Sequence, residues 1–130
     1  MSEKSTSVVD ANVIVSLLLG SERGHFARAK AFFEPVREGS AWAYIPAAVL
    51  AECVYVLTRA YGIAREDVAN KLIGVLDYRS VLTESAAVRQ ALMLYRDRKV
   101  DFFDALVAAT ARERGWRVFS FDRDLKGLAK

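Results

Sequence analysis

Four acidic residues lie in apolar stretches of this chain, where an ordinary protein core would not place them. Asp10 ends one strand-like run and Asp122 follows another, while Glu52 and Asp104 lie within apolar helical segments. Carboxylates are rarely buried without a partner. If the fold brings these four together, they form an oxygen-lined pocket suited to a hard divalent cation such as Mg²⁺ or Mn²⁺.

Such a pocket points to hydrolysis of phosphodiester bonds. Two carboxylates ~4 Å apart repel each other by ~4 kcal/mol at an effective dielectric constant of ~20, so four together need protonation, basic partners or cations. A divalent cation would make a water molecule nucleophilic and neutralise charge on the leaving oxygen. The four acids therefore predict a metal-dependent phosphodiesterase.

Three of these acids have an alternative explanation in ordinary helix or ion-pair chemistry. Asp10 and Asp122 could each be the N-cap of a helix, accepting hydrogen bonds from backbone N–H groups. Glu52 could form a buried ion pair with Arg59. Metal ligation is the better explanation for Glu52, because its neighbours are almost all apolar and isolated burial of its charge would be costly.

Residues close in sequence to these acids could assist them. Asp101 and Asp104 are three apart, so they would face one side of a helix, with Asp101 as N-cap and Asp104 in the first turn. Asp104 is the better candidate ligand, because it lies inside the apolar run. Asn12 and Ser120 could orient a carboxylate or a metal-bound water, or be an ordinary first-turn residue and a small strand residue.

The elements that would position these residues alternate along the chain. Short apolar runs indicate strands, and apolar residues at helical spacing indicate helices. We expect strands over residues 7–9, 42–45, 80–82 and 117–121. We expect helices over residues 13–19, 24–38, 46–60, 65–76, 84–98 and 102–114, and a short helical tail from residue 122. This order predicts a parallel sheet covered by helices on both faces, with the first strand central.

Open α/β sheets bind ligands beyond the carboxyl ends of their strands. Asp10 and Asp122 would both lie at such ends, so two non-adjacent strands would deliver carboxylates to the same rim of the sheet. The buried helix that carries Asp104 would begin at that rim as well. The predicted fold therefore gives a physical reason for the acids to converge.

Length and composition indicate one globular domain over residues 1–130. Apolar residues make up 53% and charged residues 27%, and the net charge of +3 is too small to establish a polyanionic partner. The single cysteine, Cys53, permits neither an internal disulfide nor a cysteine zinc site. The sequence contains no stretch typical of a signal peptide or a membrane span, so we expect a cytoplasmic protein without membrane association.

Other kinds of catalytic site lack the residues they need. The sole histidine, His25, lies away from every acid, and Cys53 has apolar neighbours and no nearby histidine. A phosphatase of the haloacid dehalogenase type needs an Asp where Asn12 stands. A receiver domain would need an Asp at the end of a middle strand, but Ile45 and Leu82 end those strands.

Two further groups of residues have open interpretations. Tyr55, Phe33 and Leu57 could form a dimer seam or pack in the core. Basic residues flanking the two C-terminal acidic segments could contact phosphates or form a solvated helix face. These residues are Arg96, Arg98, Lys99, Arg112, Arg114, Arg117 and Arg123.

Four sequence segments together resemble a known family. They are VVDAN at 8–12, AEC at 51–53, DFFDAL at 101–106 and FSFD at 119–122. Their order and spacing resemble those of PIN domains over essentially the whole chain, and most closely those of the VapC toxin ribonucleases of VapBC toxin–antitoxin modules. The resemblance implies a three-layer α/β/α fold with four to five parallel strands, and Mg²⁺- or Mn²⁺-dependent endoribonuclease activity on RNA. It also implies a homodimer and a cognate antitoxin that blocks the acidic site.

The resemblance also assigns roles to residues. Position by position, Asp10, Glu52, Asp104 and Asp122 match the acidic quartet of the family, which implies that they are the catalytic metal ligands, with Asp101 as a fifth contributor. Ser120 stands where a Thr is frequent, and it keeps the hydroxyl group. The alternative is a PIN domain that binds RNA or protein without catalysis.

Overall fold

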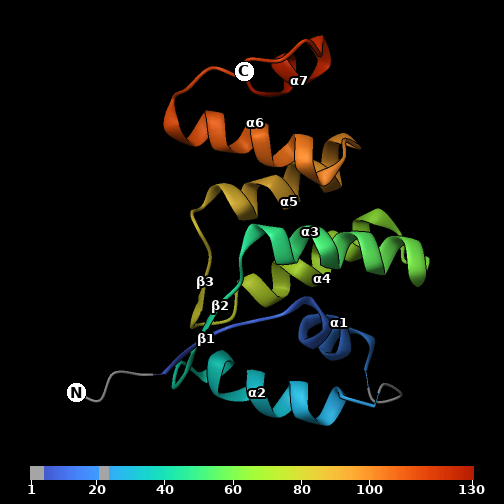
Figure 1. Ribbon diagram of the computed structural model, residues 1–130, viewed down its shortest axis with the longest axis vertical. Helices are drawn as coiled ribbons and strands as arrows, with labels where there is room; N and C mark the ends of the chain where they lie inside the picture. The colour runs from blue at the N-terminus through green and yellow to red at the C-terminus, as the bar shows by residue number, and fades with distance from the viewer. Residues whose placement is uncertain (1–4, 21–23) are drawn as a thin grey trace.

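The computed structural model describes residues 5–20 and 24–130, and it shows an elongated α/β molecule (Figure 1). Its sheet has three short parallel strands in the order β1-β2-β3. These are β1 (Thr6–Val8), β2 (Trp42–Tyr44) and β3 (Val81–Leu82). The strands therefore follow three of the four segments that were expected to form them.

Helices connect and follow the strands. Between β1 and β2 lie α1 (Ala11–Leu19) and α2 (Phe26–Glu38); between β2 and β3 lie α3 (Ala47–Tyr55), the π-helical η1 (Val56–Ala60) and α4 (Arg65–Leu76). After β3 come α5 (Ala87–Arg98), α6 (Phe102–Arg114) and α7 (Arg123–Leu128). In Figure 1, α1 and α2 lie on one side of the strands and α3 and α4 on the other, while α5, α6 and α7 are stacked beyond them toward one end.

The core lies around the sheet and the inner helices. Its largest fully buried side chains come from α1, α2, the residue after β2 and the helices that follow, and they include Phe33, Ile14, Ile45, Leu50 and Leu57. Burying each side chain of this size stabilises the fold by roughly 1.5–3 kcal/mol. Phe33 and Leu57 thus pack in the core, which leaves only Tyr55, 62% exposed, of the three residues considered for a dimer seam.

The expectation of four to five strands is wrong in this structure. Within the described residues no strand forms over 117–121, and β1 is an edge strand instead of the central one. The cause lies in α6, which packs along α5 through Phe102 and a row of small buried alanines. This packing carries the following segment away from the sheet, so Phe119 and Phe121 are 90% and 96% exposed.

The corner between α5 and α6 is anchored to α4. Arg65, at the start of α4, donates hydrogen bonds from Nη1 to the carbonyl oxygens of Tyr95 (2.8 Å) and Val100 (2.7 Å). Its guanidinium group also lies 4.2 Å from the centre of the Tyr95 ring. Lys99, which lies between Tyr95 and Val100 in the sequence, adopts a left-handed backbone conformation with φ of 56°. This conformation is uncommon for a residue other than glycine. Arg65 therefore fixes the point at which the chain turns into α6.

None of the helices within residues 5–20 and 24–130 is long and apolar enough to cross a membrane.

Candidate active site

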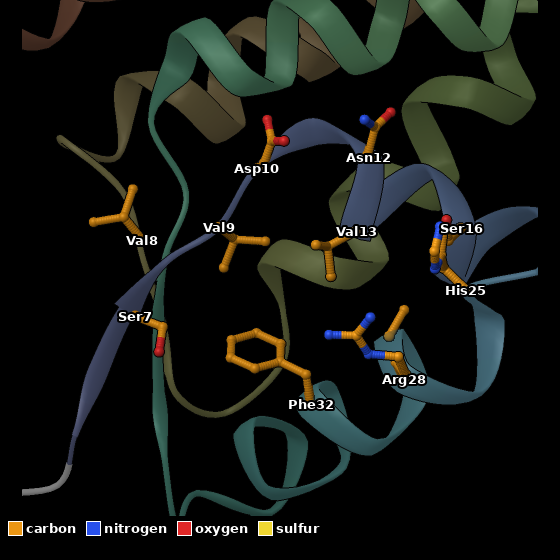
Figure 2. Close-up of a pocket in the computed structure, with 11 residues that line it drawn as sticks. Ser7, Val8, Val9, Asp10, Asn12, Val13, Ser16, His25, Arg28 and Phe32 are labelled. Atoms are coloured by element: carbon orange, nitrogen blue, oxygen red, sulfur yellow. The ribbon is translucent and has the colours of Figure 1, made fainter.

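Asp10 and Asn12 lie at the start of α1, beyond the carboxyl end of β1. Oδ1 of Asp10 accepts a hydrogen bond of 2.8 Å from the Ala11 backbone N–H, so Asp10 is the N-cap of α1. Both side chains are exposed and point toward α3 (Figure 2). The N-cap explanation of Asp10 is therefore correct, and it leaves the carboxylate accessible to solvent.

Glu52 lies on the exposed side of α3, contrary to the expectation that its charge is desolvated. The buried positions of this helix include Leu50, Ala51 and Cys53, and their packing turns Glu52 outward. The alternative ion pair is also absent within the described residues, where the Arg59 guanidinium instead lies 5.7 Å from the centre of the Tyr55 ring.

The thiol of Cys53, next to Glu52 on α3, is buried against the start of α1. Sγ of Cys53 is 3.9 Å from the carbonyl oxygen of Ala11 and is fully buried. Burial, and then the negative charges of Glu52 and Asp10, raise the pKa of Cys53 from 9.0 to about 12. The thiol therefore stays protonated near neutral pH, which argues against a nucleophilic role. The negative charges of Asp10 and Glu52 thus both act on this thiol.

Asp101, Asp104 and Asp122 form a second group, at the starts of α6 and α7. Oδ1 of Asp101 accepts a hydrogen bond of 2.8 Å from the Asp104 backbone N–H, which makes Asp101 the N-cap of α6. Partial burial, and then the charges of Asp101 and Asp122, raise the pKa of Asp104 above its ordinary value. Asp104 is half-buried and the other two are exposed, so an unneutralised cluster of negative charge faces solvent here.

Hydrogen bonds restrain both the carboxylate and the backbone N–H group of Asp122. Its Oδ1 accepts from the backbone N–H groups of Asp124 (2.9 Å) and Leu125 (3.3 Å), so it is the N-cap of α7. Its own backbone N–H donates to Oγ of Ser120 at 2.9 Å. Ser120 therefore positions the backbone of Asp122 and does not hydrogen-bond to its carboxylate.

The four acids thus form two groups, one at α1 and α3 and one at α6 and α7. Figure 1 shows α3 and α5 between α1 and α6. In the part of the chain that the structure describes, no three residues among His, Cys, Asp and Glu are close enough to hold a metal ion. The donor atoms are all oxygens, which suits a hard divalent cation, but the arrangement in one chain does not gather enough of them.

Glu84 has a structural role that the sequence motifs did not indicate. Both carboxylate oxygens of Glu84 accept from the backbone N–H of Ala47, at 2.9 and 3.0 Å. The N-cap of this helix, α3, is Pro46, which has no side-chain acceptor. A proline at a helix start, followed by apolar residues, signals that the first N–H groups need an acceptor from elsewhere in the chain.

A cavity of about 600 Å³ opens beside β1, between α1 and α2 (Figure 2). The side chain of Val9 points into it, and Phe32 of α2 lines the opposite wall. His25 and Arg28 provide the basic groups of its lining. His25 therefore lies beside this cavity, on the same side of the molecule as Asp10.

These features define an α/β protein with a parallel sheet and acidic residues at the starts of several helices. The sequence matches the family model of the PIN domain over residues 7–130, so the chain belongs to the PIN domain family. PIN domains are generally nucleases, which supports hydrolase activity in a general sense. No curated protein was found to match the sequence. The expected family is thereby confirmed, whereas the VapC subtype stays a prediction.

Proposed function

We propose that the protein is a metal-dependent endoribonuclease that hydrolyses RNA phosphodiester bonds, and that it is the VapC-type toxin of a type II toxin–antitoxin module. One observation carries the proposal: a PIN domain chain has an acid at each of four motif positions. The acids are Asp10, Glu52, Asp104 and Asp122. Asp10 and Asp122 cap helices, where backbone N–H groups restrain their carboxylates, and Asp104 lies in the first turn of α6.

Mg²⁺ or Mn²⁺ is the proposed cofactor, since PIN domains usually use divalent metals. The negative charges of Asp101 and Asp122 act on Asp104, so a cation bound beside Asp104 would relieve this repulsion. The N-cap hydrogen bonds of Asp10 and Asp122 engage only Oδ1. Each carboxylate therefore keeps its second oxygen for a ligand.

Basic residues on α6 and α7 support RNA as the substrate. Arg112 on α6, Arg123 on α7 and Arg117 between these helices are exposed, and they would contact phosphates without reading sequence. Arg96 is a weaker candidate, because its guanidinium group is held by Asp97 at 2.8 Å and by Asn70 at 3.0 Å. A single domain over residues 1–130, a homodimer, a cytoplasmic location and a cognate antitoxin complete the proposal.

A PIN domain that binds RNA or protein without catalysis is the second candidate function. Asp10, Asp101 and Asp122 are all helix N-caps, which accounts for their presence without any chemistry. This role leaves the exposed Glu52 unexplained.

One assay separates the two functions. A labelled single-stranded RNA is incubated with the purified protein in Mg²⁺, in Mn²⁺ and in EDTA, and both cleavage and binding are measured. The nuclease cleaves with either metal and stops in EDTA. Binding without cleavage in all three conditions would reject the nuclease in favour of the binding module.

A further inference from the structure

Two parts of this chain, β1 and residues 117–121, could each pair with a further strand. Within residues 5–20 and 24–130, β1 is paired on one side only, and Val8 within it is 73% exposed. Residues 117–121, which follow α6, include the apolar Val118, Phe119 and Phe121, yet they pair with no strand in the described structure. Phe119 and Phe121 contact each other with ring centres 5.7 Å apart, but both rings otherwise face solvent. An open edge strand and an exposed apolar segment are each prone to association.

The open edge of β1 presents backbone groups in a defined pattern. The Val9 N–H donates to Tyr44 and the Ser5 carbonyl accepts from Trp42, so odd-numbered residues bond to β2. Backbone groups of alternate residues point to opposite sides of a strand. Those of Thr6 and Val8 therefore face the open edge and are available to another strand.

β1 and residues 117–121 have the same arrangement of residues before a helix, and this similarity sets the register in which they would pair. In each, an apolar run leads to an aspartate that caps the following helix, Asp10 for α1 and Asp122 for α7. Parallel alignment of these aspartates places Phe121 beside Val9 and Phe119 beside Ser7. Paired residues on adjacent strands share a face of the sheet. Both rings would thus enter the 600 Å³ cavity into which Val9 points (Figure 2).

The segment cannot reach its own β1 without disrupting the chain's packing. Figure 1 shows α6 and α7 toward one end of the longest axis, and β1 and α2 toward the other. α6 is held against α5 by its buried Phe102 and alanines, and Arg65 anchors the corner between the two helices. A second copy can offer its β1 without undoing these contacts.

We infer that two copies of this chain exchange strands, with residues 117–121 of each copy pairing in parallel with β1 of the other. Such an exchange gives the backbone groups at the open edge of β1 hydrogen-bond partners. It buries the exposed rings of Phe119 and Phe121. It also brings Asp122 of one copy beside Asp10 of the other, so the two groups of acids meet only between chains. This last consequence rests on the proposed nuclease function, whereas the pairing itself does not.

The oligomeric state tests the pairing. Val8→Pro removes an N–H that faces the open edge, and proline is tolerated at such edge positions, so pairing with β2 should survive. We expect a dimer for the unchanged protein by light scattering. We expect monomers for Val8→Pro and for the double variant Phe119→Ser/Phe121→Ser. Phe103→Ser is the matched control, because Phe103 is an exposed phenylalanine on α6, and it should stay dimeric. A monomeric unchanged protein, or a dimer that survives both sets of changes, would overturn the inference.

Disulfide trapping distinguishes exchange from pairing within one chain. The register places Val8 beside Ser120, and adjacent strands lie about 4.8 Å apart, a spacing that a disulfide can bridge. Val8→Cys and Ser120→Cys are made as separate chains in a Cys53→Ala background, mixed and oxidised. A covalent dimer joined through positions 8 and 120 supports exchange. A chain carrying both cysteines that instead closes on itself as a monomer shows pairing within one chain and overturns it.

Mixing two inactive variants tests the shared site. Asp10→Asn and Asp122→Asn chains are mixed under conditions that allow dimers to exchange. A mixed dimer has one site with both acids intact, so random mixing should restore about a quarter of the original cleavage rate. No recovery, in a protein whose unchanged form cleaves RNA, would overturn the shared site. If the unchanged protein cleaves no RNA, the proposed function fails while the 8–120 cross-link still reports on the exchange.

Discussion

The backbone N–H of Asp104 donates to Oδ1 of Asp101 at 2.8 Å, so one acid of the candidate site caps the helix that carries another. This bond fixes Asp101 at the start of α6 and keeps its negative charge close to the carboxylate of Asp104. The pKa of Asp104 rises as a result of partial burial and of this charge, with a further effect from Asp122. Helix stability and a candidate metal site therefore share the same residue.

Asp101 can be tested for both roles separately. Asp101→Ala removes the cap and should lower the free energy of unfolding by about 1 kcal/mol, because one N–H at the start of α6 loses its acceptor. Asp101→Asn keeps a capping oxygen but removes the charge, so it should preserve stability. Urea unfolding measures the contribution of the cap to stability, and the rate of RNA cleavage measures the contribution of the charge. If Asp101→Asn cleaves normally, Asp101 is a cap alone.

Removal of the charge at Asp104 or Asp10 should abolish cleavage. Asp104→Asn and Asp10→Asn keep the size of the side chain, and we expect each to lower the rate of RNA cleavage by about 100-fold or more, as loss of a main electrostatic group does. Asp97→Asn is the control, since Asp97 is an exposed acid that pairs with Arg96 at 2.8 Å. Cleavage that survives both site substitutions would refute the assignment.

Cys53 should make stability depend on alkaline pH. Its folded-state pKa of about 12 lies above the ordinary value of 9.0, so the folded protein holds the proton more tightly than the unfolded chain. The resulting stability is complete below pH 9 and declines as the pH rises from about 9 to about 12. Thermal unfolding from pH 7 to pH 10.5 should show this decline, and Cys53→Ala should reduce it. A native thiol that reacts rapidly with iodoacetamide at pH 8 would contradict the expected burial.

Arg65 should stabilise the corner between α5 and α6. Arg65→Met keeps much of the aliphatic stem but removes two hydrogen bonds to carbonyl oxygens. Hydrogen bonds from charged groups each contribute roughly 1.5–3 kcal/mol to stability. We therefore expect urea unfolding to show that Arg65→Met lowers the free energy of unfolding by an amount of this order. Arg112→Met, an exposed change on α6, serves as the control and should have little effect. Equal stability of the two variants would show that packing alone holds the corner.

Local signals in the sequence predicted most of the individual elements. Residues 42–45 and 80–82 contain β2 and β3, and the helix expected over 65–76 is α4 with the same bounds. The N-cap explanations of Asp10, Asp101 and Asp122 are also confirmed. These features depend on groups only a few residues apart, so the sequence of one segment contains the information they need.

The tertiary structure decided which faces and edges these elements present. Residues 117–121 carry a strand-like pattern, but a strand needs a partner, and the packing of α6 on α5 leaves that segment away from β1. Glu52 was expected to be desolvated, yet the rotation of α3 that buries Leu50 and Cys53 exposes it. The sequence thus determined the order and caps of the elements, most of their types, and the family of the chain. The division of the acids into two groups depends on contacts between distant segments, which no local pattern specifies.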